Sequence, residues 1–398
     1  MRSEEATVPA GHSGTRWIQP VAAGFLTAIV GFSSTFALVL QGLAAAGATR
    51  EQAASGLLAL LVATGALAII LSLRWRMPIS LAWSTPGAAL LVATGPPAGG
   101  FPAAVGAFVM AAAMIVAAGL WRPFGRAVAA IPLPLASAML AGVLLDLCLA
   151  PVRASAALPA QALPIVIVWA LAHRFARIYA VPIAVALTAA IVFATVPMPS
   201  GHLADLRPTF VWVWPVFTAE TWLGLALPLF IVTMASQNVP GLAVLRANGY
   251  EPDVGRVFVA TGLGSLALAF FGGHPVNLAA ITAALCAGPD AEPNPARRWI
   301  ASAIGGGGYL GLGLGAGFAA AFVAASPPLL IQAVAGLALL GSLGSALATA
   351  LAREEDRIPA IVTFVVAASG VSVLGIGGAL WGLVAGGAIL ALGRLRRR

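Results

Sequence analysis

The residues that could do chemistry in this chain lie where polar and helix-breaking residues interrupt long apolar stretches. One interruption is 82–87 (AWSTPG), and another is 272–277 (GGHPVN). A polar cluster, Ser236, Gln237 and Asn238, lies inside a third apolar stretch. In hydrocarbon every peptide group needs a partner within the protein, so an interruption is tolerated only where protein or a water-filled cavity covers it. Paired interruptions in the two halves of a chain indicate the binding site of a membrane carrier.

The first interruption carries the signals of a half-helix that starts inside the membrane. Pro86 suits the first turn of a helix, because its missing N–H would be unpaired there. Thr85 is then the predicted N-cap, with Gly87 and Ala88 in the first turn. The residues before it, 79–84, are predicted to be extended.

The second interruption shows the same signals. Pro275 and Asn277 precede an apolar run, and Asn277 is the predicted cap of a half-helix that starts at Leu278. The N-terminus of a helix exposes free N–H groups and carries about half a positive charge. Two such ends facing one point would bind an anion, such as a carboxylate, through the N–H groups of Gly87, Ala88 and Leu278. The alternative is that Pro and Gly only kink packed helices.

Polar side chains near the interruptions are candidate substrate contacts, and most have a structural alternative. Gln237 and Asn238 either line a cavity or hydrogen-bond neighbouring helices. Ser33 and Ser34 either face the substrate or bond back to their own helix. Trp83 either stacks on an aromatic ring or packs in the core. The full set of candidate contacts is Trp83, Ser84, Thr85, Gly87, Ala88, Ser33, Ser34, Gln237, Asn238, Asn277 and Leu278.

Ionisable groups deep in a membrane mark coupling sites in pumps. His274 is the one imidazole placed to exchange a proton near the second interruption, although a histidine there would equally cap a helix or hydrogen-bond the backbone. Asp146 and Glu220 are expected near the membrane–water interface. Cys148 and Cys286 lie in separate apolar runs with no CxxC spacing, so we expect neither a metal site nor a cofactor.

The elements that position these residues are predicted to be membrane spans. The chain is 60% hydrophobic and 9% charged, with a mean hydropathy of +0.98, which excludes a soluble domain. The net charge of +8 comes from arginines scattered between apolar runs, so no nucleic acid partner is expected. Neither a P-loop nor an HExxH motif nor a nucleophile elbow occurs, so the residues of an ATP-driven pump or an enzyme are missing.

At about 20 residues per span, the apolar runs predict an all-α polytopic membrane protein with fourteen transmembrane segments. The segment 198–218 is too polar at its start to span, and it is predicted to be an external linker with an interfacial aromatic part. The predicted spans are 18–46, 51–73, 78–97, 102–121, 125–150, 158–173, 178–197, 219–246, 254–271, 274–288, 297–325, 326–351, 357–374 and 375–393.

The arginine distribution supports this map, because arginine accumulates in cytoplasmic loops. With both termini in the cytoplasm, only Arg50, Arg153 and Arg207 of the 21 arginines lie outside, which leaves 18 inside. Fourteen spans divide into seven plus seven, and a half with an odd number of spans inserts upside down relative to its partner. We therefore expect two inverted repeats, in which the discontinuous spans 3 and 10 correspond to one another.

Three strings resemble those of a known family. They are AWSTPGAALL in span 3, LPLFIVTMASQNVPG in span 8, and NLAAITAALCAGPDA with the RRW that follows it. Together they resemble the benzoate/proton symporter family (BenE), and the likeness is collinear over nearly the whole chain. The resemblance implies a multi-pass carrier of the bacterial inner membrane that imports benzoate with a proton. It also implies a fold like that of the uracil permease.

The resemblance further implies a division into two domains. The core domain would comprise 18–121 and 219–325, and the gate domain 122–218 and 326–393, between cytoplasmic tails at 1–17 and 394–398. Such carriers form homodimers through the gate domain and move the core like an elevator.

The chain departs from the nucleobase carriers of this fold, which use carboxylates on spans 8 and 10. Here the matching positions hold Gln237, Asn238 and 275–277, so the coupling ion stays open. A carrier of another small anion or of a nucleobase, or in another class an anion channel, remains an alternative.

Overall fold

The computed structural model describes residues 17–121, 123, 132–195, 209–279, 281–373 and 376–395. Within them the chain is mostly helical, with two small two-stranded sheets. Its longer helices are α1 (Ile18–Ala45), α2 (Arg50–Trp75), α4 (Gly100–Leu120), α6 (Leu133–Ala157), α7 (Pro159–Phe175), α8 (Ala180–Thr195), α16 (Pro328–Ala350) and α18 (Gly378–Leu395). Its shorter helices are α3 (Thr85–Thr94), α12 (Val254–Ala269), α13 (Ile281–Ala287), α14 (Trp299–Gly313), α15 (Ala316–Ala325) and α17 (Arg357–Ala368).

One apolar helical stretch, Ala219–Ala247, changes its helical type along its length. It is built from α9 (Ala219–Thr221), η3 (Trp222–Ala226), α10 (Leu227–Thr233), η4 (Met234–Asn238) and α11 (Val239–Ala247). Both η3 and η4 are π-helical turns. Such turns insert an extra residue into the helical ladder and occur frequently at functional sites.

In the described part of the chain, seven helices are long and apolar enough to cross a membrane. An eighth span results if α14 and α15, which are bent by 60° at their junction, are counted as one. The predicted span 297–325 thus corresponds to two helices instead of one, because Gly313 and Gly315 flank the junction and glycine favours a kink.

Two other predicted boundaries are wrong. Helix α6 runs on through Pro151 to Ala157 instead of ending at 150, because neighbouring helices in a membrane protein tolerate a proline inside a helix. Helix α17 ends at Ala368 instead of 374, two residues before Gly370, which has φ +67°. The start of the fifth predicted span, the first part of the predicted linker and most of both predicted tails lie outside the described residues.

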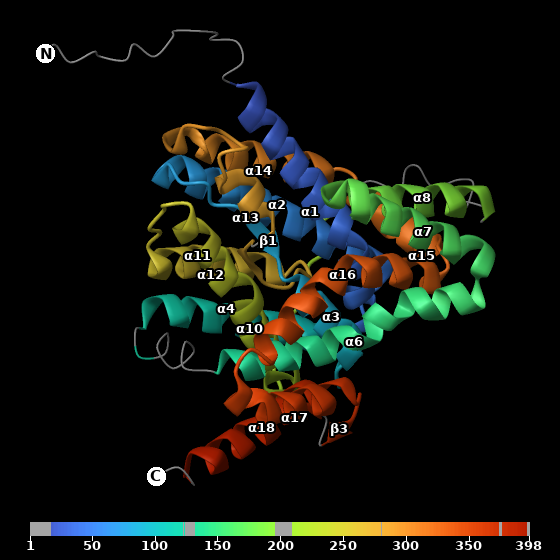
Figure 1. The fold of residues 1–398 in the computed structure, drawn as a ribbon, viewed down its shortest axis with the longest axis vertical. Helices are drawn as coiled ribbons and strands as arrows, with labels where there is room; N and C mark the ends of the chain where they lie inside the picture. The colour runs from blue at the N-terminus through green and yellow to red at the C-terminus, as the bar shows by residue number, and fades with distance from the viewer. Residues whose placement is uncertain are drawn as a thin grey trace, which may run out of the picture.

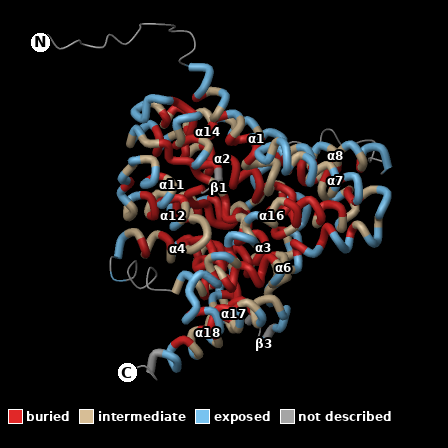
Figure 2. The backbone as a smooth tube through the Cα atoms, viewed as in Figure 1, coloured by how far each residue is buried: buried red, intermediate tan, exposed pale blue. Residues whose placement is uncertain are grey.

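Helices far apart in the sequence lie side by side (Figure 1). Helix α14 packs on α1 and α2, α12 packs on α4, and α6 packs on α16 and α17. Figure 2 shows the buried positions concentrated around β1, α3 and α16, while much of α7 and α8 is exposed. Exposed apolar side chains such as Ile167 and Phe193 are what a lipid-facing surface requires.

The two interrupted stretches meet in the centre of the protein. Strands β1 (Leu81–Trp83) and β2 (Val276–Leu278) pair antiparallel, with Ala82 opposite Asn277. The ladder continues at both ends, where Ser84 N–H donates to Pro275 O (3.1 Å) and Ala279 N–H donates to Ser80 O (3.0 Å).

Side chains of neighbouring helices complete the hydrogen bonding of this crossing. The Val276 N–H donates to Ser265 Oγ of α12 at 2.9 Å. On the other side Ser72 Oγ of α2 donates to Ile79 O at 3.3 Å. Both serines are buried. The non-helical backbone is thus covered by protein, as an apolar environment requires.

Candidate substrate-binding site

The N-terminus of α3 lies where β1 ends, and its cap is Ser84. Ser84 Oγ accepts a hydrogen bond from the Gly87 N–H (3.1 Å) and another from Thr233 Oγ1 of α10 (2.8 Å). The prediction of Thr85 as cap is wrong by one residue, because Thr233 fixes the Ser84 hydroxyl in the capping position. The Thr85 side chain is left partly exposed.

We expect Ser84→Ala to lower the free energy of unfolding by about 1–2 kcal/mol, because the Gly87 N–H and the Thr233 hydroxyl both lose a partner. Thr85→Ala removes a partly exposed side chain and should change stability by less than about 0.5 kcal/mol. Thermal unfolding of both variants in detergent checks this. Equal losses in the two variants would contradict Ser84 as the cap.

The three N–H groups predicted to bind an anion are occupied. The Gly87 N–H donates to Ser84 Oγ, the Ala88 N–H to Ser84 O (2.9 Å), and the Leu278 N–H to Asn238 Oδ1 (3.0 Å). The prediction of these groups as free donors is wrong for this conformation, because capping and interhelical bonds already use them. In the described part of the chain, the Thr85 N–H donates to no atom, so it is the amide left at this helix end.

Asn277 does not cap the second half-helix. It lies in β2 and is fully buried, and its Nδ2 donates to Leu278 O (2.7 Å). Helix α13 starts only at Ile281. The predicted cap is wrong because pairing with β1 holds the chain extended through Leu278. The Asn277 Oδ1 atom has no hydrogen-bond partner among the described residues.

The polar cluster Ser236, Gln237 and Asn238 contains one buried amide and one partly exposed amide. Asn238 is fully buried in η4, where its Oδ1 accepts from the Leu278 N–H and its Nδ2 lies 3.2 Å from Met234 Sδ. The alternative of interhelical bonding therefore describes Asn238. Gln237, its neighbour, is partly exposed. The two amides are consecutive residues of the same π-helical turn and therefore point in different directions, one into the protein core and one to a partly exposed position.

The serines of α1 bond back to their own helix. Ser33 Oγ donates to Ile29 O (2.6 Å), and Ser34 Oγ donates to Val30 O. Both residues are partly exposed, so their oxygens keep free lone pairs. The next residue, Thr35, is the one that contacts the crossing.

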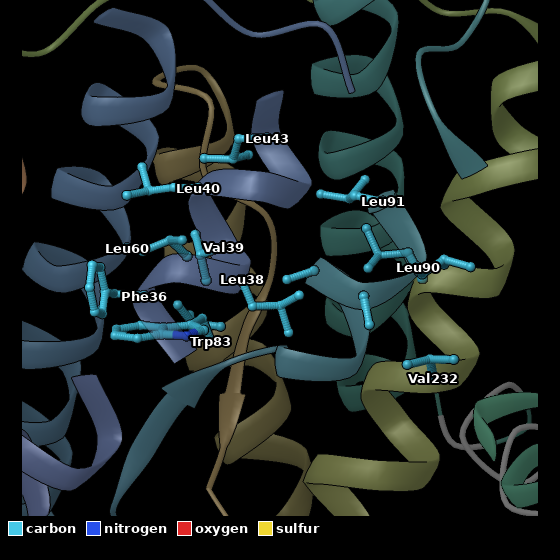
Figure 3. Packing of buried hydrophobic residues seen from close by; sticks show 14 of the residues in the cluster. Phe36, Leu38, Val39, Leu40, Leu43, Leu60, Trp83, Leu90, Leu91 and Val232 are labelled. Atoms are coloured by element: carbon cyan, nitrogen blue, oxygen red, sulfur yellow. The ribbon is translucent and has the colours of Figure 1, made fainter. Parts of the chain in front are cut away.

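Trp83 packs in the core in this conformation. Its Nε1 donates to Thr35 Oγ1 (2.9 Å), and its ring lies edge-on to Tyr309, with 5.7 Å between ring centroids. Only 2% of the residue is exposed. Figure 3 shows the indole of Trp83 among side chains of α1 and α2, with Phe36 beside it.

His274 is fully buried, and its ring meets Phe108 of α4 edge-on at 6.4 Å between centroids. Neither ring nitrogen has a hydrogen-bond partner among the described residues. The imidazole thus contacts an aromatic residue rather than the hydroxyl and amide groups around Ser84. Its role in proton exchange stays a prediction.

The structure links the candidate residues through contacts that the sequence does not reveal. Thr35 joins α1 to β1, and Thr233 joins α10 to the cap of α3. Thr233 lies one helical turn before Gln237. This spacing was the sequence signal that could have indicated Thr233 as a residue of the site. Tyr309 follows a run of four glycines, 305–308, which lets α14 approach α1 closely.

The candidate contacts that remain partly exposed are all neutral. They are Ser33 and Ser34 of α1, Thr85 of α3 and Gln237 of η4. No cluster of His, Cys, Asp or Glu with the composition of a metal site occurs within the described ranges. Such a set suits a small anion or polar molecule held at a helix N-terminus.

Comparison with known proteins supports the assignment made from the motifs. A family model described as benzoate membrane transport protein, BenE, matches residues 16–392. The chain is 42% identical over 370 residues to the inner membrane protein YdcO of Escherichia coli, covering 92% of this chain and 93% of that protein. It is 32% identical over 369 residues to the benzoate membrane transport protein of Acinetobacter baylyi, covering 92% of each.

Solved structures of low sequence identity share the fold. The transmembrane domain of a cyanobacterial bicarbonate transporter, BicA, has a TM-score of 0.61 and 18% identity, covering 93% of this chain and 97% of that chain. The murine anion transporter Slc26a9 also has a TM-score of 0.61, with 15% identity, covering all of this chain and 73% of that chain.

The relatives and the apolar helices together place the protein in the bacterial inner membrane as a multi-pass protein. The prediction of that location is confirmed. Because the family model spans nearly the whole chain and two relatives exceed 30% identity over nine-tenths of it, the chain belongs to the BenE family of benzoate membrane transport proteins, which are transporters rather than enzymes.

Proposed function

We propose that the protein is a secondary carrier that imports benzoate, or a similar aromatic carboxylate, together with a proton. The observation that carries the proposal is the pairing of β1 with β2 beside the N-terminus of α3, in a chain of this family. No charged residue occurs in α1, β1, α3, η4, β2 or α13. A carboxylate there would be held by neutral dipoles, and the end of a ten-residue helix supplies them.

The carboxylate contacts follow from which groups are unoccupied. We assign the Thr85 N–H and hydroxyl as the donors at the end of α3, with the Gln237 amide opposite. The Ser33 and Ser34 oxygens would line the remaining wall. Ser84, Asn238 and Asn277 would position these groups rather than contact the substrate.

The arrangement of helices supports a division into a moving and a static part. Elements α1–α4 and α9–α15 would form the core domain, and α6–α8 with α16–α18 the gate domain. In this proposal the two interrupted stretches and the shorter helices of the described residues would also count as spans, which would make fourteen, in two inverted repeats of seven. The proposal includes an elevator-like movement of the core, a homodimer through the gate domain and cytoplasmic termini.

Uptake of radiolabelled benzoate into proteoliposomes tests the function. We expect saturable uptake, and an inward proton gradient should increase its initial rate several-fold. At equilibrium, a one-to-one symport with a proton accumulates benzoate about tenfold for each pH unit, since each 1.4 kcal/mol corresponds to a factor of ten.

Benzoic acid also crosses lipid unaided and reaches the same final ratio, so the initial rate is the decisive quantity. Protein-free liposomes and Gln237→Ala proteoliposomes are the controls. Uptake that matches the protein-free control would contradict a benzoate carrier. Uptake that saturates but ignores the proton gradient would contradict only the coupling.

A further inference from the structure

A cavity of about 480 Å³ opens between α3, α6, α9–η3 and the junction of α17 with α18. Its volume is in the range of small-molecule pockets. Leu90 and Leu225 line it and are each only 1% exposed, so they form its inner end. Leu90 lies on α3 five residues after Thr85, about 7.5 Å along the helix axis at 1.5 Å per residue. The cavity therefore approaches the N-terminus of α3 from the opposite end of that helix.

The arginine pattern gives the side of the membrane on which the cavity opens. Helix α17 starts at Arg357, and its last residues, Ala367 and Ala368, line the cavity. Likewise Glu220 lines it at the start of the stretch whose other end carries Arg246. Since arginine-rich ends are cytoplasmic, the cavity lies at the external end of both elements.

The walls of the cavity come from both helix groups. Helix α3 and the turn η3 belong to the group assigned to the core, whereas α6, α17 and α18 belong to the group assigned to the gate. A movement of one group against the other would therefore open or close it.

The charges on the walls are partly balanced. Asp146 lies on α6 and forms an ion pair with Arg153 at 2.7 Å. The hydroxyl-bearing residues Thr94, Thr221 and Ser369 also line the cavity. A small monoanion can therefore pass beside hydroxyl groups and one neutralised carboxylate, with Glu220 as the remaining negative charge.

We infer that this cavity is the external vestibule of the transport path, and that Leu90 and Leu225 form the constriction between a small carboxylate in the vestibule and the Thr85 end of α3. The inference rests on the proposed carrier function and adds to it an outward-facing conformation and an external gate. A second cavity of about 280 Å³, lined by Arg353, Asp356 and Ile389, lies at the other end of α17 and serves as the internal reference.

Cysteine accessibility in intact cells tests the inference. In a background in which the buried Cys148 and Cys286 are replaced by Ala, single cysteines are introduced as Thr94→Cys, Leu90→Cys and Ile389→Cys. The probe is a membrane-impermeant, negatively charged methanethiosulfonate reagent, and labelling is read as a mass shift of the purified protein.

We expect Thr94→Cys to react from outside, and Leu90→Cys to react at least tenfold more slowly. Ile389→Cys should react only after the membrane is permeabilised. Modification of Thr94→Cys should reduce benzoate uptake at least tenfold relative to the same variant before modification.

Labelling of Thr94→Cys only after permeabilisation would overturn the external position. Full labelling from outside with unchanged uptake would overturn its place on the path, and equal rates at Leu90 and Thr94 would overturn the constriction. If the unmodified carrier takes up no benzoate, the substrate assignment fails. The mass shifts then still support or overturn the external cavity on their own.

Discussion

Replacing Asn238 by Ala should abolish transport and lower the melting temperature, whereas Gln237→Ala should leave the melting temperature unchanged and weaken substrate binding. Asn238 Oδ1 is the partner of the Leu278 N–H at the end of β2. Both residues are buried, so removing the oxygen leaves a buried donor unsatisfied at a cost of about 1–3 kcal/mol. The β2 strand would then lose the bond that fixes it against η4.

Gln237 and Asn238 form a matched pair for this test. Both carry a side-chain amide and lie on the same helix, but only Asn238 is buried. Initial uptake rates at a series of benzoate concentrations separate the effects. We expect a loss of maximal rate in Asn238→Ala and an increase in the apparent KM of about tenfold in Gln237→Ala, the loss of a hydrogen bond to a charged ligand being about 1.5–3 kcal/mol.

The opposite pattern would show that Asn238 contacts the substrate and that Gln237 holds the fold. Unchanged uptake in both variants would remove η4 from the site altogether. Thermal unfolding in detergent, measured beside the uptake, shows whether a loss of rate comes from a loss of folded protein.

The elements themselves were largely readable from the sequence, because the signals are local. The 28 residues of α1 match the predicted 18–46 within one residue, since an apolar run of that length has no other stable form in a membrane. The sequence predicts an extended conformation for 79–84, and the structure has a strand at 81–83 within that stretch. Pro86 also lies in the first turn of α3, as predicted.

The hydrogen-bond partners at the site were not readable, because they depend on contacts between distant segments. Nothing local distinguishes Ser84 from Thr85 as a cap, and Thr233, 149 residues away, decides between them. The π-helical turn that contains Gln237 and Asn238 has no sequence signal in a single chain. The occupation of the Leu278 N–H by Asn238 likewise appears only when β2 and η4 are placed together.

Close contacts between helices could not be predicted from the sequence either, although the sequence shows the glycines that permit them. Gly42 of α1 lies against the first turn of α3, and a Cβ at this position would be 2.7 Å from Ala88 O. Gly241 of α11 lies against the end of β2 in the same way, where a Cβ would be 2.6 Å from Leu278 Cβ. Each interrupted stretch is thus approached by a helix through a glycine.

Gly42→Ala should therefore lower stability and transport together. The obstructing atom is a backbone oxygen, so α3 itself must shift, at a cost of about 1–3 kcal/mol for an overpacked contact. Gly307→Ala in α14 is the matched control, because a Cβ there meets no atom within 4 Å. Alanine in a helix interior gains about 0.5–1 kcal/mol over glycine, so this variant should melt at a higher temperature than the parent.

The two substitutions are expected to change the stability in opposite directions, so the comparison separates the two effects. Helix propensity alone raises the stability of both variants, and only the contact between α1 and α3 lowers that of Gly42→Ala. Gly241→Ala should behave like Gly42→Ala, because its new methyl group would press on Leu278 beside the bond to Asn238. Gly42→Ala would contradict this prediction if its melting temperature, like that of Gly307→Ala, were higher than the parent's and its transport were normal. The end of α3 would then not be held by α1. The position of the Thr85 N–H, and with it the proposed carboxylate site, would have to be set by another element.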